Sequence, residues 1–180
     1  MNRSFTDHLI TGSAELKSPW FSNRWELLVN GEVLARIQRI PRLHVSTISL
    51  ADGSLWVVEP AGTSAVRLLD NPGHEFARIT RRSWWGRSWT VSGDRFSYDL
   101  VSHPTPRRWR FELGGSPIAE LSGSLISYNK VRVHSLLALP LPALILGWHV
   151  IARPWEAAAA PSGLVPKPHV GPSDNPDIAR

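Results

Sequence analysis

Hydrophobic and polar residues alternate along much of the chain, and this alternation predicts β-strands. In residues 108–113, Trp109, Phe111 and Leu113 alternate with charged side chains, which indicates a strand with one buried face. The same reasoning predicts further strands over Val45–Leu50, Ser54–Val58, Ser88–Ser92 and Arg95–Val101. Turn residues separate these runs, so we expect a mainly β protein of antiparallel hairpins.

Three segments align without gaps at an offset of 42 residues: Trp25–Ile37, Arg67–Ile79 and Trp109–Leu121. Each contains a glycine in a turn dipeptide, followed four residues later by an alanine; the turns are Asn30-Gly31, Pro72-Gly73 and Gly114-Gly115, and the alanines are Ala35, Ala77 and Ala119. Glycine suits such turns because they need positive φ. An unbroken register implies one supersecondary unit, here two hairpins, used three times.

One segment near the C-terminus is apolar on every side, from Leu136 to Ile151. An all-round hydrophobic helix is buried in a protein core or in lipid. Because prolines are tolerated in the first turn of a helix, Pro140 and Pro142 place its start near Leu141, and Arg153-Pro154 places its end at Ala152. Its length, ~18 Å, is shorter than a membrane span of ~20 apolar residues.

The repeat and the helix together predict a closed barrel. Propellers repeat at a similar period but need at least ~4 blades, and only three units fit. The predicted strands give eleven, or twelve with a strand around His8–Thr11. Since ~8 strands already leave just enough room for side chains, a wider barrel needs a plug, which the helix provides. The barrel domain is predicted over residues 1–154, and residues 155–180 are predicted to form a disordered Pro-rich tail.

These features resemble the tubby C-terminal-like superfamily, which includes tubby domains, phospholipid scramblases and the LURP-one-related proteins. The resemblance rests on the repeat, the strand count and the Leu136–Ile151 segment, and it covers roughly Phe5 to Pro154. It implies a closed twelve-stranded antiparallel barrel threaded by a hydrophobic helix. No binding residue is carried over: the lysine-rich phosphoinositide pocket of tubby proper has no counterpart in a chain whose lysines are Lys17, Lys130 and Lys167.

The inward-facing positions of the predicted strands and the helix define a core. We expect burial of Trp25, Ala35, Ile37, Ala77, Ile79, Trp109, Phe111, Ala119, Leu121, Leu144, Ile145 and Trp148. The three repeated alanines are expected where the helix approaches the barrel wall and a larger side chain would collide with it.

The formal net charge is +5, and the basic residues are almost all arginine. Arg36 and Arg78 occupy one position of the repeat and are expected on the solvent face of a strand. Arg39 and Arg81 occupy another position of the repeat. Alternation along the strand would turn these two side chains inward, so we expect them at or beyond a strand end, or after a bulge. Repetition itself favours a structural explanation for these charges, because duplicated scaffolds duplicate their surfaces.

One basic segment departs from the pattern and is the candidate site: Arg81, Arg82, Trp84, Trp85 and Arg87. Tryptophan and arginine together are typical of membrane interfaces, where the ring lies at headgroup depth and the guanidinium pairs with phosphate. The same residue types would suit single-stranded nucleic acid. The structural alternative is that Trp89 and Trp109 face the core, which leaves Trp84 and Trp85 in a loop.

Motifs for catalysis are absent from the sequence. It contains no cysteine, no His-Glu-x-x-His, no Gly-x-Ser-x-Gly and no glycine-rich phosphate loop. His149 lies in the apolar helix, where we expect a hydrogen-bonded core histidine. We therefore expect no enzyme activity, no cofactor and no bound metal. The first residues lack the apolar region of a signal peptide, which predicts a cytoplasmic protein.

Two functional hypotheses follow. The first is a peripheral binding module for anionic phospholipid headgroups or a membrane-associated partner, suggested by the resemblance and by the Trp/Arg segment. The second is a soluble scaffold whose barrel binds a protein partner. An integral protein anchored by Leu136–Ile151 is a third option, against which the two prolines and the short span count. We do not expect a nucleic-acid partner, and we expect a monomer.

Overall fold

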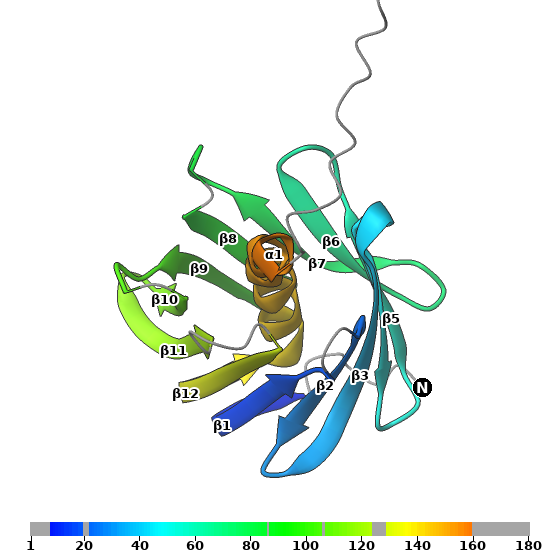
Figure 1. The fold of residues 1–180 in the computed structure, drawn as a ribbon. Coiled ribbons are helices and arrows are strands. Elements are labelled where there is room, and N and C mark those ends of the chain that lie inside the picture. The colour runs from blue at the N-terminus through cyan, green and yellow to red at the C-terminus, as the bar shows by residue number, and fades with distance from the viewer. Residues whose placement is uncertain (1–7, 20–21, 86, 106, 124–128, 160–180) are drawn as a thin grey trace, which may run out of the picture.

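Twelve antiparallel strands close into a barrel around helix α1 (Leu141–Ala159) in the computed structural model, which describes residues 8–19, 22–85, 87–105, 107–123 and 129–159 (Figure 1). Each strand pairs with its neighbours in sequence, and β1 also pairs with β12, which closes the barrel. The predicted fold class is confirmed. The strands are β1 (Leu9–Lys17), β2 (Arg24–Val29), β3 (Glu32–Ile40), β4 (Val45–Leu50), β5 (Leu55–Pro60), β6 (Ala65–Asp70), β7 (Glu75–Arg81), β8 (Ser88–Gly93), β9 (Phe96–Ser102), β10 (Arg108–Leu113), β11 (Ser116–Gly123) and β12 (Lys130–Pro140).

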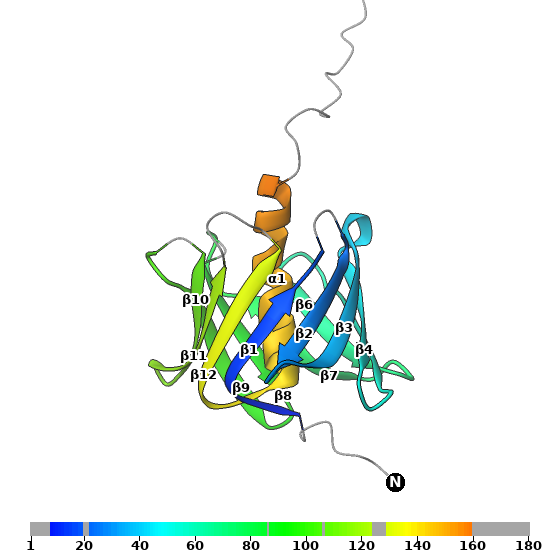
Figure 2. The same cartoon turned by 60° about the horizontal axis from the view of Figure 1, so that its bottom comes forward.

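The strand connections gather at two ends of the barrel, because successive strands run in opposite directions. At one end, which we call the hairpin end, lie the short turns that follow β2, β4, β6, β8 and β10 and the start of α1. At the other, the loop end, lie the connections after β3, β5, β7 and β9, including the 3-10 helix η1 (Pro41–Leu43). Helix α1 runs from the hairpin end through the barrel and projects beyond the strands at the loop end (Figure 2).

Helix α1 begins where the prolines predicted, at Leu141, whose N–H donates to the carbonyl oxygen of His8 at 2.8 Å. Every residue from Leu141 to Ala152 is buried. The predicted end at Ala152 is wrong, because the helix continues to Ala159. Its last turn is a run of alanines, whose high helix propensity offsets the cost of the preceding proline. The remainder of the predicted tail, residues 160–180, lies outside the described residues.

Among the helices that the structure describes, none is long and apolar enough to cross a lipid bilayer.

Strand β12 corrects the expectation that the whole Leu136–Ile151 segment is buried. Leu136–Pro140 belongs to the strand, and the side chains of Leu136 and Leu137 are 61% and 57% exposed. The pairing of β12 with β1 is irregular here: Leu139 pairs with Ile10, whereas Ser135 already pairs with Gly12. The extra residues form a bulge, which displaces the leucines to the surface.

Helix α1 lies off the barrel axis, closest to β6, β7, β8 and β12. Gly147 permits close packing, because a Cβ atom there would lie 2.6 Å from Cζ of Phe111. On another side, Trp148 packs edge-on against Trp25 with ring centroids 5.2 Å apart. The approach of the helix therefore explains a small residue at Ala77 of β7, but Ala35 and Ala119 lie on strands that are not among the closest to α1.

The three aligned hairpins share a local geometry. Gly31, Gly73 and Gly115 all lie in hairpin-end turns with φ of 86°, 113° and 83°, which a residue with a side chain adopts only with strain. Each hairpin also has one unpaired residue soon after its turn, and these bulged residues are Leu34, Phe76 and Ile118. These three bulged residues are also 42 residues apart in the sequence. That the whole barrel consists of three copies of one unit stays a prediction.

The core matches the predicted residues except at Trp109, which is only partly buried at the edge of the core. Trp89 likewise packs against the core from a partly buried position.

Arg39 and Arg81, whose positions the sequence left open, have different surroundings. Arg81 is exposed, whereas Arg39 is only 3% exposed, and its guanidinium carbon lies 5.2 Å from the centroid of the Trp148 ring. This position allows a cation–π interaction.

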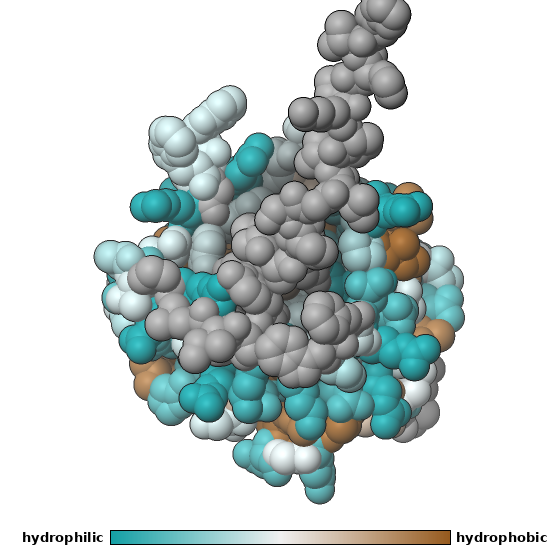
Figure 3. All heavy atoms as spheres, viewed as in Figure 1, coloured by the Kyte–Doolittle hydropathy of each residue, from teal (hydrophilic) through white to brown (hydrophobic). Residues whose placement is uncertain are grey.

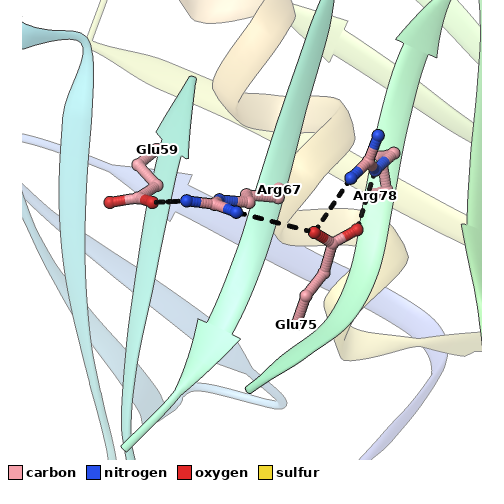
Figure 4. Close-up of polar contacts among 4 residues, drawn as sticks. All are labelled: Glu59, Arg67, Glu75 and Arg78. Carbon is pink, nitrogen blue, oxygen red and sulfur yellow. Dashed lines mark hydrogen bonds and ion pairs between the residues drawn. The ribbon is translucent and has the colours of Figure 1, made fainter. Parts of the chain in front are cut away.

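The outer wall carries ion pairs between neighbouring strands (Figure 4). Arg67 of β6 lies 2.6 Å from Glu59 of β5 and 4.0 Å from Glu75 of β7. Arg78 donates to Glu75 at 2.7 Å, and this hydrogen bond lowers the pKa of the Glu75 carboxyl. Arg78 thus lies on the solvent face, as predicted, and so does Arg36, which lies 3.7 Å from Glu26.

Candidate functional site

The predicted site forms the connection between β7 and β8 at the loop end. The hydroxyl oxygen of Ser83 accepts hydrogen bonds from the backbone N–H groups of Arg87 and Ser88, at 3.0 and 3.1 Å. The N–H of Arg82 donates to the carbonyl oxygen of Ser88 at 2.9 Å. These bonds close the base of the loop, and Trp84 and Trp85 lie beyond it with their side chains exposed.

Trp84 and Trp85 are the most exposed large hydrophobic residues among those described, at 85% and 82%. By contrast, Trp25, Trp56 and Trp148 are buried in the core. An exposed pair of large aromatic side chains is an informative observation, because soluble domains rarely leave such groups in water without a binding role. The structure therefore places both tryptophans where a membrane or a partner can reach them.

The three arginines of the site differ in their surroundings. Arg82 is tied to the wall, because its guanidinium lies 2.9 Å from Asp99, which also accepts a hydrogen bond from Thr90. Arg81 and Arg87 are exposed, and among the described contacts no ion pair involves either of them. The structure therefore brings the five predicted residues together at the end of β7 and in the loop that follows it, with Arg81 as the last residue of the strand, and it leaves the charge of Arg82 partly offset.

The two ends of the barrel carry opposite charge. Among the described residues, the strand ends and connections of the loop end contain no Asp or Glu, and their basic residues are Lys17, Arg24, Arg42, Arg81, Arg82, Arg87, Arg107, Arg108 and Lys130. The described residues of the hairpin end include Arg95 as the one Arg or Lys, and their acidic residues are Glu32, Asp52, Asp70, Glu75 and Asp94. The Trp84–Trp85 pair lies at the basic end.

A second exposed hydrophobic group lies at the loop end, in and beside η1. Leu43 is 63% exposed and Ile40 is 42% exposed, with the exposed Arg42 between them. Figure 3 looks onto this end and shows hydrophobic surface beside η1 within a largely hydrophilic rim. Sequence reasoning missed these residues. The repeat contained the signal, since Leu43 precedes Trp85 by 42 residues.

The barrel interior contains a buried polar pair, Ser46 of β4 and His149 of α1, with Oγ and Nδ1 3.1 Å apart. Neither residue has exposed surface. His149 is thus the hydrogen-bonded core histidine that we expected. The pair links the helix to the wall and lies out of reach of a dissolved substrate.

The outer wall contains a hollow of about 630 Å³ that crosses β11, β12 and β1. Its charged lining residues are of mixed sign: Glu15 and Glu120 are acidic, and Arg108 and Arg132 are basic. Arg108 lies 3.7 Å from Glu120, and Glu15 lies 2.8 Å from Lys130 beside the hollow. Because acidic and basic groups alternate, the hollow does not select for charge of either sign. Within the described part of the chain, no three His, Asp or Glu residues converge as metal ligands.

Comparison with known proteins gives a fold and no function. No family model matches the chain, and no curated protein matches it. Among solved structures, the X-ray structure of an Arabidopsis thaliana protein is similar, with a TM-score of 0.56 and 11% sequence identity over 86% of this chain and 99% of the other. A likeness at this identity supports the fold alone.

Proposed function

We propose that the protein is a non-enzymatic module that binds the surface of anionic phospholipid membranes through its loop end. The observation that carries the proposal is the pair Trp84 and Trp85, both more than four-fifths exposed, at an end whose described strand ends and connections contain no Asp or Glu. Exposed aromatic rings beside arginines fit the membrane interface, where the rings lie among headgroups and the guanidinium groups pair with phosphate.

The energetics of this contact have two parts. Shallow insertion removes apolar surface of the two tryptophans from water, at about 25 cal/mol per Å². Each basic residue near an anionic surface adds about 1 kcal/mol, which salt screens. Arg81 and Arg87 contribute most to the second part, because the charge of Arg82 is shared with Asp99.

The proposal includes membership of the tubby C-terminal-like superfamily and a cytoplasmic location, with the protein peripheral to the membrane. A twelve-stranded barrel with an internal helix is the fold that the resemblance implies. A cytoplasmic location would supply the ligand, because the cytoplasmic leaflet carries the anionic lipids.

Vesicle flotation tests the proposal. The double variant Trp84→Ala/Trp85→Ala should no longer float with vesicles of phosphatidylcholine and phosphatidylserine, while its melting temperature stays close to that of the wild type. The matched control is Leu136→Ala/Leu137→Ala, which removes the exposed apolar pair of β12 and should bind like the wild type.

If the tryptophan variant still binds, the loop is not the contact. If its melting temperature falls sharply, the tryptophans support the fold instead.

The alternative is a soluble scaffold that binds a protein partner. The bulge that exposes Leu136 and Leu137 favours it, since it presents an apolar pair on the outer wall. The same flotation experiment separates the two functions. A scaffold would float with neither anionic nor neutral vesicles, whatever residues occupy positions 84 and 85.

A further inference from the structure

We infer that the barrel docks on the membrane end-on, with a second contact at η1 through Leu43 and Ile40. This inference rests on the proposed function and adds an orientation to it. The partner is the same anionic phospholipid surface, and the new element is a hydrophobic contact on another part of the rim.

Two exposed apolar groups at separate points of one rim can fix the tilt of the barrel. The Trp84–Trp85 loop connects β7 to β8, whereas η1 connects β3 to β4, so the two lie four strands apart around the wall. A single contact would leave the axis free to tilt about that point. With both contacts in the interface, the loop end faces the lipid and the barrel axis stands steeply on the surface.

Charge favours the same orientation. The basic residues Arg42 and Arg81 lie beside the two apolar groups, and among the described contacts no ion pair involves either of them. At the hairpin end, a hydrogen bond from the N–H of Ser54 lowers the pKa of Asp52, so this carboxylate stays ionised. Near an anionic membrane, the basic end is attracted and the acidic end is repelled.

The local structure of η1 supports a role in contact. Pro41 begins the 3-10 turn, and His44 ends it in the left-handed conformation with φ of 56°. This turn points Leu43 away from the core, and none of its three residues is buried. An exposed leucine on a short turn, next to an exposed arginine, repeats the chemistry of the tryptophan loop with an aliphatic side chain.

The chain has no cysteine, which permits single-cysteine labelling with an environment-sensitive fluorophore. Four labelled variants test the orientation: Leu43→Cys and Trp85→Cys at the loop end, and Leu55→Cys and Leu137→Cys outside it. On addition of phosphatidylcholine/phosphatidylserine vesicles, the labels at positions 43 and 85 should shift to the blue, and those at 55 and 137 should not change.

The outcomes separate the inference from the function on which it rests. If the protein binds and only the label at position 85 responds, end-on docking is overturned and membrane binding stands. If the label at 55 responds, the hairpin end faces the lipid, and if the label at 137 responds, the wall does; either result overturns the inference. If no label responds and no variant floats, both proposals fail.

A substitution without a label provides the second readout. Leu43→Ala should weaken binding to the same vesicles by roughly tenfold, because it removes most of an inserted leucine side chain. Leu55→Ala, an exposed leucine at the hairpin end, is the matched control and should bind like the wild type. Equal affinity of Leu43→Ala and the wild type would overturn the second contact.

Discussion

The two ends of the barrel expose hydrophobic side chains in comparable number but differ in charge. The hairpin end and the adjoining wall present Leu9, Leu55, Leu113, Leu136 and Leu137, and the loop end presents Ile40, Leu43, Trp84 and Trp85. Exposed apolar surface alone would therefore not distinguish them. The hairpin end combines it with carboxylates and the loop end with guanidinium groups. An anionic surface would attract the second electrostatically and repel the first.

The difference in charge between the two ends follows from the structural roles of their connections. At the hairpin end, carboxylates stabilise tight turns: Asp52 accepts the N–H of Ser54 at 2.8 Å, and Asp70 accepts those of Gly73 and His74. Acidic turn residues are thus explained by local structure. At the loop end, the side chains of Trp84 and Trp85 make no such turn-stabilising hydrogen bond among the described contacts. The proposed membrane contact gives Trp84, Trp85 and Arg87 a role, whereas Arg82 also pairs with Asp99.

The largest expected effect comes from reversing charge at the loop end. Arg81→Glu/Arg87→Glu should weaken binding to anionic vesicles by about thirtyfold or more, since each arginine contributes about 1 kcal/mol. Arg36→Glu/Arg95→Glu makes the same change of charge away from the loop end and should have little effect. Vesicle co-sedimentation measures both. Equal losses would show that net charge, and not its position, decides binding.

A smaller effect is expected for the core that joins the two ends. Ala77→Leu should destabilise the protein by about 1–3 kcal/mol through overpacking, because Ala77 is buried on a strand that α1 approaches closely. Thr80→Leu on the exposed face of the same strand should stay within about 0.5 kcal/mol of the wild type. Denaturant melts measure both. A neutral Ala77→Leu would mean that the helix does not pack tightly against β7.

The smallest effect concerns pH at the hairpin end. The hydrogen bond from Arg78 holds the pKa of Glu75 below its usual value of 4.5. A lowered carboxyl pKa adds stability that is present above pH 4.5 and is lost as the pH falls through the folded-state pKa. Glu75→Gln should therefore lower the melting temperature by at most about 2 °C at pH 7, and the difference should become smaller at pH values well below 4.5. A difference that stays as large there would exclude ionisation as its cause.

Much of the fold could be predicted because its signals are local. Alternation predicted the strands, glycine turns predicted the hairpins, and the prolines predicted the start of α1 at Leu141. The end of the helix could not be predicted in this way. It depends on how a proline and the following alanines balance once the helix has passed through the barrel.

The remaining differences are tertiary in origin. Arg39 and Arg81 share a repeat position, yet only Arg39 is buried, beside Trp148, because α1 is not centred in the barrel. Leu136 and Leu137 are exposed because β12 bulges against β1. Of the predicted site, Arg82, Trp84, Trp85 and Arg87 lie in the β7–β8 connection and Arg81 ends β7. The pairing of Arg82 with Asp99 could not be predicted, because it depends on a strand that follows later in the chain.

The central claim is that the loop end binds anionic membranes, and flotation of the wild-type protein tests it most directly. Vesicles with and without phosphatidylserine are compared at low and at high salt. The protein should float with the anionic vesicles at low salt, float less at high salt, and remain at the bottom of the gradient with neutral vesicles. Equal flotation with both kinds of vesicle, or none with either, would contradict the claim.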